Sequence, residues 1–90
     1  MTNIKINDMA NIDCKSGQIY CLHKVGEPVS AFFNIANIGD GELSISMTED
    51  FDNYIILPKD TYFNGIYGRI IYLRSDGDTN VNVVMTRREV

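Results

Sequence analysis

The stretch YIILPKDTYFNGIYGRIIYLRSDGDTNVNVVMT, residues 54–86, decides the fold of this chain. It holds three runs of apolar, β-branched and aromatic residues, and such residues favour strands. The first run, residues 54–57, stops at Pro58, which fixes its own φ and has no N–H for a neighbouring strand. Asn64-Gly65 and Asp76-Gly77 supply residues that favour tight turns. The pattern predicts strand, turn, strand, turn, strand.

The residues upstream of this stretch extend the same pattern. Residues 42–48 alternate cleanly between polar and apolar. Their apolar members, which would face inward, are Leu43, Ile45 and Met47. Gly39-Asp40-Gly41 is a strong hairpin signal and predicts that residues 42–48 pair with residues 29–38. With a further run at residues 18–23 the chain holds six to seven short strands, which predicts an all-β fold: a small antiparallel β-sandwich or a partly open barrel.

Residues 1–13 lack a clear period, although isoleucines alternate weakly near their start. We interpret them as an N-terminal arm that reaches a neighbouring subunit, or as an edge segment of the sheet, with residues 14–90 forming a single β-sandwich domain. In an arm, the residues expected to contact the partner are Ile4, Ile6, Met9 and Ile12. Phe51, inside the acidic loop 49–53, is a further candidate anchor for a partner, and an inward-facing aromatic is the alternative.

Composition excludes several classes of function. Ninety residues suffice for one domain, and 44% hydrophobic with 22% charged residues is typical of a globular chain. The net charge of -4, without a basic cluster, argues against nucleic-acid binding, which needs a dense basic face. The sequence also lacks a signal-peptide pattern and an apolar run as long as a membrane span. We therefore expect neither a nucleic-acid partner nor a membrane partner, and synthesis in a cytoplasm.

The residues that could carry chemistry do not form a convincing site. His23 shares a strand face with Cys21, but side chains two apart on a strand point in parallel and are poorly placed to act as a catalytic pair. Cys14 and Cys21 are spaced more widely than the cysteine pairs of structural zinc sites, which favours free thiols. Residues 76–80 begin like a calcium loop, but Val81 stands where that loop needs glycine. We expect no enzymatic activity, no metal and no cofactor.

A group of residues in the C-terminal third resembles the small β-sandwich virion proteins of tailed bacteriophages, namely head decoration, head-fibre-base and tail accessory proteins. The residues that carry the resemblance are Ile56-Leu57-Pro58, an aromatic at Tyr62 or Phe63, Gly65, Tyr67-Gly68, residues 69–75, Asp76-Gly77 and the alternating valines that follow. Where these proteins would have glycine in the turn after the proline, this chain has Lys59-Asp60. The resemblance implies a non-enzymatic structural protein of the virion, made in the host cytoplasm.

The same resemblance implies that the partners are other virion proteins, of the capsid or the tail, and that the chain forms a homo-oligomer. Physical reasoning agrees, because a small sheet leaves edge strands that are either blunted or used to pair with neighbours. The alternative is a carbohydrate-binding or adhesin-like module that stacks sugars on Tyr62 and Tyr67. Core and turn packing is the plainer use of these two tyrosines.

Overall fold

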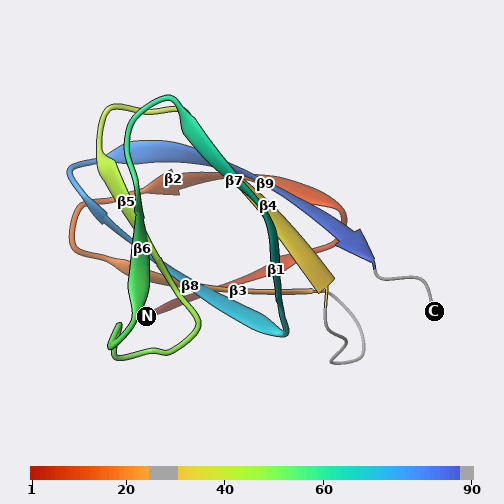
Figure 1. Ribbon diagram of the computed structural model, residues 1–90. Coiled ribbons are helices and arrows are strands. Elements are labelled where there is room, and N and C mark those ends of the chain that lie inside the picture. The colour runs from red at the N-terminus through yellow and green to blue at the C-terminus, as the bar shows by residue number, and fades with distance from the viewer. Residues whose placement is uncertain (25–30, 88–90) are drawn as a thin grey trace.

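The computed structural model describes residues 1–24 and 31–87, which contain nine strands and no helix (Figure 1). In chain order the strands are β1 (Thr2–Ile6), β2 (Met9–Cys14), β3 (Ile19–Lys24), β4 (Ala31–Asn37), β5 (Glu42–Ser46), β6 (Tyr54–Leu57), β7 (Thr61–Gly68), β8 (Ile70–Asp76) and β9 (Thr79–Arg87). The predicted all-β sandwich is confirmed, with more strands than the six to seven expected. Positions 25–30 and 88–90 of the predicted domain 14–90 lie outside the described residues, and they include positions 29 and 30 of the predicted run 29–38.

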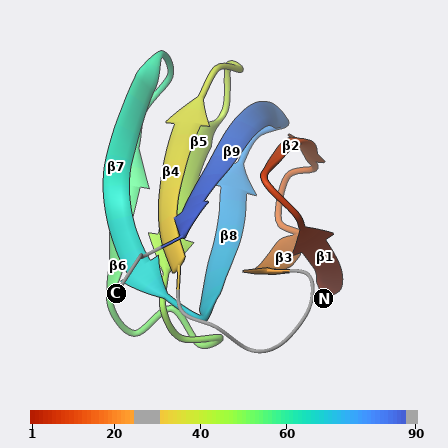
Figure 2. The ribbon, with the colours of Figure 1, turned by 90° about the vertical axis from the view of Figure 1, so that its right-hand side faces the viewer.

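The strands form two sheets packed face to face. The five-stranded sheet has the order β1-β3-β8-β5-β6, and the four-stranded sheet has the order β2-β9-β4-β7. Every pairing is antiparallel except that of β1 with β3. Figure 2 shows β9, β4 and β7 side by side, with β1 and β2 on one flank of the molecule and β6 and β7 on the other. From each strand to the next, the chain passes from one sheet to the other. The exception is the step from β5 to β6, which are neighbours in the same sheet.

This alternation overturns one predicted hairpin. Gly39-Asp40-Gly41 leads from β4 in one sheet to β5 in the other, and β4 pairs with β7 and β9 instead of β5. The glycines are needed for close approach. A Cβ on Gly39 would collide with the backbone of Thr79 and Asn80, and one on Gly41 would collide with the carbonyl of Gly77. The two turns that cross between the sheets therefore pack against each other at one end of the sandwich.

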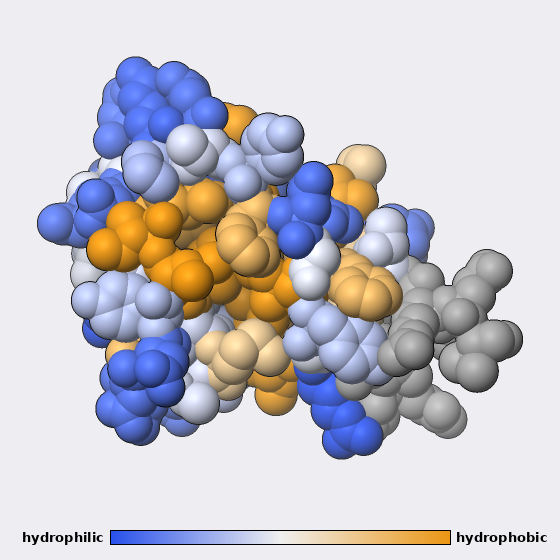
Figure 3. All heavy atoms as spheres, viewed as in Figure 1, coloured by the Kyte–Doolittle hydropathy of each residue, from blue (hydrophilic) through white to orange (hydrophobic). Residues whose placement is uncertain are grey.

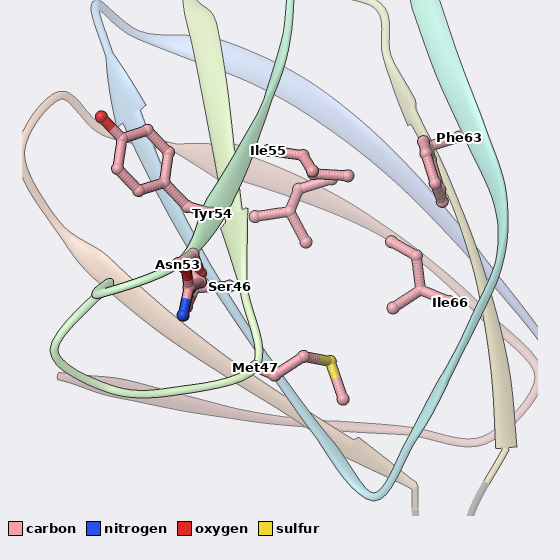
Figure 4. A pocket seen from close by; sticks show the side chains of 8 residues that line it. Ser46, Met47, Asn53, Tyr54, Ile55, Phe63 and Ile66 are labelled. Carbon is pink, nitrogen blue, oxygen red and sulfur yellow. The ribbon is translucent and has the colours of Figure 1, made fainter.

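The predicted turn at Asn64-Gly65 is also wrong, because these residues lie inside β7. The pairing register of β4 with β7 shifts between Phe33 and Ile35, and Gly65 has a φ of 80°. The Gly65 N–H donates to Asn34 Oδ1 at 2.9 Å. An extra residue of this kind is a β-bulge, which re-aims the side chains on either side of it. Phe63 and Ile66, three residues apart, consequently both point between the sheets (Figure 4).

The core consists of the inward-facing residues of both sheets, and the predicted alternation holds in most of them. Those at most 3% exposed include Phe33, Ile35, Leu43, Ile45, Ile71, Leu73, Val81 and Val83. Met47, predicted to face inward with Leu43 and Ile45, is instead 49% exposed at the end of its segment. The apolar faces thus place the two layers together, and the exposed Met47 marks where the packing ends.

A buried amide ties the two layers at one end. Asn37, fully buried at the end of β4, donates through Nδ2 to the carbonyls of Gly41 and Leu57, each at 2.8 Å. Its Oδ1 accepts from Thr79 Oγ1 at 2.6 Å. Because Leu57 belongs to β6 and Thr79 to β9, this one side chain joins both sheets and a crossover turn.

Replacing Asn37 with alanine is expected to lower the free energy of unfolding by about 3 kcal/mol, because two buried carbonyls and a hydroxyl lose their partner. Urea denaturation would measure the loss. Asn82→Ala is the control, since Asn82 is exposed and bonds only to Asn11 among the contacts described for its side chain. It should cost less than about 0.5 kcal/mol. Equal losses in the two variants would contradict a special role for Asn37.

Candidate functional site

An apolar cleft of about 340 Å³ opens between the outer edges of the two sheets. Its walls are β6, the last strand of one sheet, and β7, the last strand of the other. The apolar side chains that line it are Ile45, Met47, Tyr54, Ile55, Phe63 and Ile66, and Ser46 and Asn53 complete it (Figure 4). The β6–β7 turn at residues 58–60 and the Asn37 network close one end. The β7–β8 crossover at residues 68–70 lies at the other end, beside Met47, so the cleft opens sideways between β6 and β7.

Large side chains of the cleft remain in contact with solvent. Ile45 forms the floor at 3% exposed, whereas Ile55 is 38%, Phe63 43% and Met47 49% exposed. Figure 4 shows Ile55 reaching in from β6 while Phe63 and Ile66 reach in from β7. Figure 3 shows the resulting apolar patch at the centre of this face. A contiguous apolar surface with a polar surround is typical of an interaction site.

The two strands that border the cleft are uncharged along their whole length. β6 reads YIIL and β7 reads TYFNGIYG. The edge strands on the opposite flank each carry a charge, Lys5 in β1 and Asp13 in β2. Charges on edge strands discourage pairing with other chains. The features that blunt the β6–β7 flank are the bulge in β7, the four-residue length of β6 and the Pro58 that follows it, and none of them is a charge on either strand.

The structure does not support an N-terminal arm. β1 pairs with β3 and β2 pairs with β9, so residues 1–13 lie at the edges of the two sheets, as the edge-segment alternative has it. Ile6 and Ile12 are buried at 1% and 4%, and Ile4 packs against the same core. Ile6 and Ile12 therefore lie in the core of this chain and are not available as partner contacts, whereas a partner contact at the partly buried Ile4 stays a prediction. Of the four, Met9 alone is well exposed, at 71%, and it lines a second hollow of about 340 Å³ on β2 and β9.

Phe51 also packs inside its own chain. It is 5% exposed, and the guanidinium carbon of Arg74 lies 4.3 Å from its ring centroid. The loop around it is held down by Ser46, whose hydroxyl donates to the carbonyl of Asn53 at 2.9 Å and accepts from the N–H of Thr48 at 3.1 Å. The inward-facing alternative for Phe51 is therefore correct, and the prediction of a partner anchor is wrong.

Tyr62 and Tyr67 lie on β7 at 70% and 45% exposed. Tyr62 pairs with Ala36, whereas Tyr67 pairs with Phe32, whose ring lies 5.0 Å away at an interplanar angle of 50°. Sugar stacking needs an open aromatic face with free polar groups beside it. The Asn34 amide between them is engaged by Gly65 and by the carbonyl of Val84. Tyr62 is the more open of the two possible stacking residues.

The cysteine and histidine side chains do not form a cluster that could act as a site. Cys14 and Cys21 are buried free thiols. Burial, with a smaller effect of Asp13, raises the pKa of Cys14 to about 12. Burial also raises the pKa of Cys21, aided by Glu49 and opposed by a hydrogen bond with Tyr72. Within residues 1–24 and 31–87, His, Cys, Asp and Glu side chains form no group of three that could hold a metal ion, and no helix could cross a bilayer.

Sequence reasoning missed Ile55, Phe63 and Ile66 as site residues. They are of the same apolar type as core residues, and their position at the sheet edges depends on the pairing of distant strands. One signal was present: the two runs beside Pro58 contain no charge, although a strand at an edge usually does.

The buried thiol of Cys14 is expected to make the protein less stable in alkaline solution. Its pKa is about 12 when folded against 9.0 as an ordinary thiol, so the unfolded chain ionises first. The stabilisation that the neutral buried thiol provides is complete below pH 9. Above pH 9 the free energy of unfolding falls by up to about 1.4 kcal/mol per pH unit. Urea denaturation at mildly and strongly alkaline pH would measure the slope. Cys14→Val should reduce it, and an unchanged slope would contradict the assignment.

The cleft thus combines two free strand edges, an apolar interior and no charged side chain among its lining residues. Comparison of the chain with protein-family models, with curated proteins and with solved structures finds no match in any of the three. Its function is therefore inferred from the cleft itself and from the resemblance noted in the sequence.

Proposed function

We propose that this chain is a non-enzymatic structural protein of a tailed-phage virion, and that it binds another protein chain through the β6–β7 cleft. One observation carries the proposal: Met47, Ile55 and Phe63 stand half exposed between two uncharged strand edges. A partner strand added to such an edge gains main-chain hydrogen bonds, and its side chains find apolar contacts in the cleft.

The chemistry of the lining favours a polypeptide over a small polar ligand. Sites for small molecules place a few polar groups so that they converge on the ligand. Here the Ser46 hydroxyl is already bonded to the carbonyl of Asn53 and the N–H of Thr48. Covering the exposed apolar area contributes about 25 cal/mol per Å², from which the entropic cost of association is subtracted. The apolar side chains of a partner strand supply that cover.

The virion setting is supported by the resemblance of the C-terminal third to phage accessory proteins, and by the size of the domain. A small cleft gives modest affinity for each copy, and a symmetric particle multiplies it by avidity. With residues 1–13 engaged in the chain's own sheets, the contact moves from the predicted arm to the β6–β7 flank. The partner is then a capsid protein, a tail protein or a further copy of the chain.

A glycan-binding role is the second candidate, and the exposure of Tyr62 is the observation that favours it. Because the chain has no Trp, tyrosine fluorescence would report a sugar stacked on this ring. Saturable quenching by simple glycans, abolished in Tyr62→Ala, would support glycan binding. An unchanged signal at millimolar sugar would exclude it as the main function.

Particles of a phage that encodes this chain are expected to contain it, and Phe63→Asp should lower its copy number at least tenfold, because a charge then enters the cleft. Mass spectrometry of gradient-purified particles would count the copies. Tyr62→Asp is the matched control, since Tyr62 is 70% exposed on the same strand and outside the cleft lining. Absence of the wild-type chain would overturn the virion role. Equal incorporation of both variants would overturn the role of the cleft.

A further inference from the structure

We infer that the chain itself is a partner for this cleft, with two copies joined edge to edge about a two-fold axis through the β6–β7 flank. The inference rests on the proposed function of the cleft and names its occupant as a second copy. Three features carry it: the charges that flank the two edge strands, the symmetry available to these strands, and the apolar area that they expose.

The charges around the two edges are self-complementary. β6 is preceded by Asp52 and followed by Lys59, and β7 is preceded by Asp60 and followed by Arg69. Each uncharged strand therefore begins beside an acid and ends beside a base. When two copies of a strand pair antiparallel, the beginning of one lies against the end of the other, so unlike charges meet at both ends.

The same charges oppose the alternative of parallel pairing, which would set acid against acid and base against base. Lys59 already bonds to Asp40 at 2.8 Å, but its side chain is still 56% exposed. Arg69 and Asp60, both exposed, have no such contact described between them in one copy, because they lie at opposite ends of β7. They are the stronger pair across the two-fold axis.

A two-fold axis perpendicular to the sheets places β6 against β6 in one layer and β7 against β7 in the other. Residues opposite each other in an antiparallel pair share a face, so Ile55 of one copy meets Ile55 of the other on the inward side. In the second layer β7 faces its own copy near the Asn64-Gly65 bulge, where the ladder is interrupted. The main-chain bonds therefore form between the β6 strands, and Phe63 and Met47 of both copies close over a continuous core.

The exposed area is large enough for a specific dimer of modest affinity. Five large side chains on this flank are 38–49% exposed: Met47, Tyr54, Ile55, Ile56 and Phe63. A half-exposed side chain of this size offers on the order of 100 Å². The two copies together would bury roughly 1,000 Å², which is near the lower limit for a specific protein interface. We expect a dissociation constant in the micromolar range.

Charge placed at the axis should break the dimer. The Ile55→Lys variant sets two lysines against each other, and we expect its dissociation constant to rise at least about a hundredfold. Val84→Lys is the matched control, because Val84 is 39% exposed against 38% for Ile55 and lies on β9 outside the cleft. Light scattering over a range of concentrations would measure both variants, and circular dichroism would show that both are folded.

Cross-linking tests the geometry directly. In Ile56→Cys, the new thiols of two copies lie close to the axis, within reach of a short bis-maleimide reagent. Ile38→Cys is the control, since Ile38 and Ile56 are each 49% exposed but Ile38 lies in the β4–β5 turn and not on β6. The native Cys14 and Cys21 are buried and should not react. A covalent dimer from Ile56→Cys alone is the expected result.

A wild-type chain that stays monomeric at millimolar concentration would overturn the self-pairing, and so would a dimer that survives Ile55→Lys. Either failure is distinguishable from failure of the proposed function, which the particle experiment decides. A monomer whose incorporation into particles still depends on Phe63 would mean that a different virion protein occupies the cleft. Preferential cross-linking of Ile56→Cys, with loss of the dimer in Ile55→Lys, would support the pairing of two copies.

Discussion

The buried amide of Asn37 is the constraint on which the arrangement of the two sheets depends. Apolar burial is not directional, so two apolar faces could slide or rotate against each other at little cost. Asn37 is satisfied only when the crossover at Gly41, the end of β6 and the start of β9 all reach it. At that end the layers are pinned together. Away from that end no comparable bond is described between β6 and β7, and the inner side chains of these two edge strands become the walls of the cleft.

The sequence predicts the local structure well and the partners of each strand poorly. Alternation in residues 42–46 and 80–85 is set by neighbours along the chain, so the inward faces follow from it directly. A glycine-rich turn suits a hairpin or a crossover equally, and Gly39 and Gly77 turned out to serve crossovers because distant backbone packs against them. Phe51 depends on Arg74, far away in sequence. The cleft was missed for the same reason, since only long-range pairing leaves Ile55 and Phe63 at an edge.

The molecule has two unlike flanks, and this limits how it can assemble. The β1–β2 flank carries Lys5 and Asp13 on its edge strands, whereas β6 and β7 contain no charged residue. A sheet protein that is open on both sides can add copies without end. With one side open, pairing about a two-fold axis uses the only uncharged flank of the described sheets in both copies and stops at two. The same asymmetry would orient the chain on a larger particle.

The alternation of strands between sheets also determines when the protein can fold. β8 lies in the middle of one sheet and β9 is one of the two interior strands of the other, so neither sheet is continuous until the last third of the chain has left the ribosome. Nearly all pairings join residues far apart in sequence, and such topologies fold slowly. The uncharged strands β6 and β7 emerge after β5 and β4, with which they pair, but before β8 and β9, which lie on the other side of β5 and β4 in the two sheets. During synthesis the uncharged strands β6 and β7 are therefore exposed on incomplete sheets until β8 and β9 are added, and a chaperone or slow translation at that point would have the greatest effect on yield.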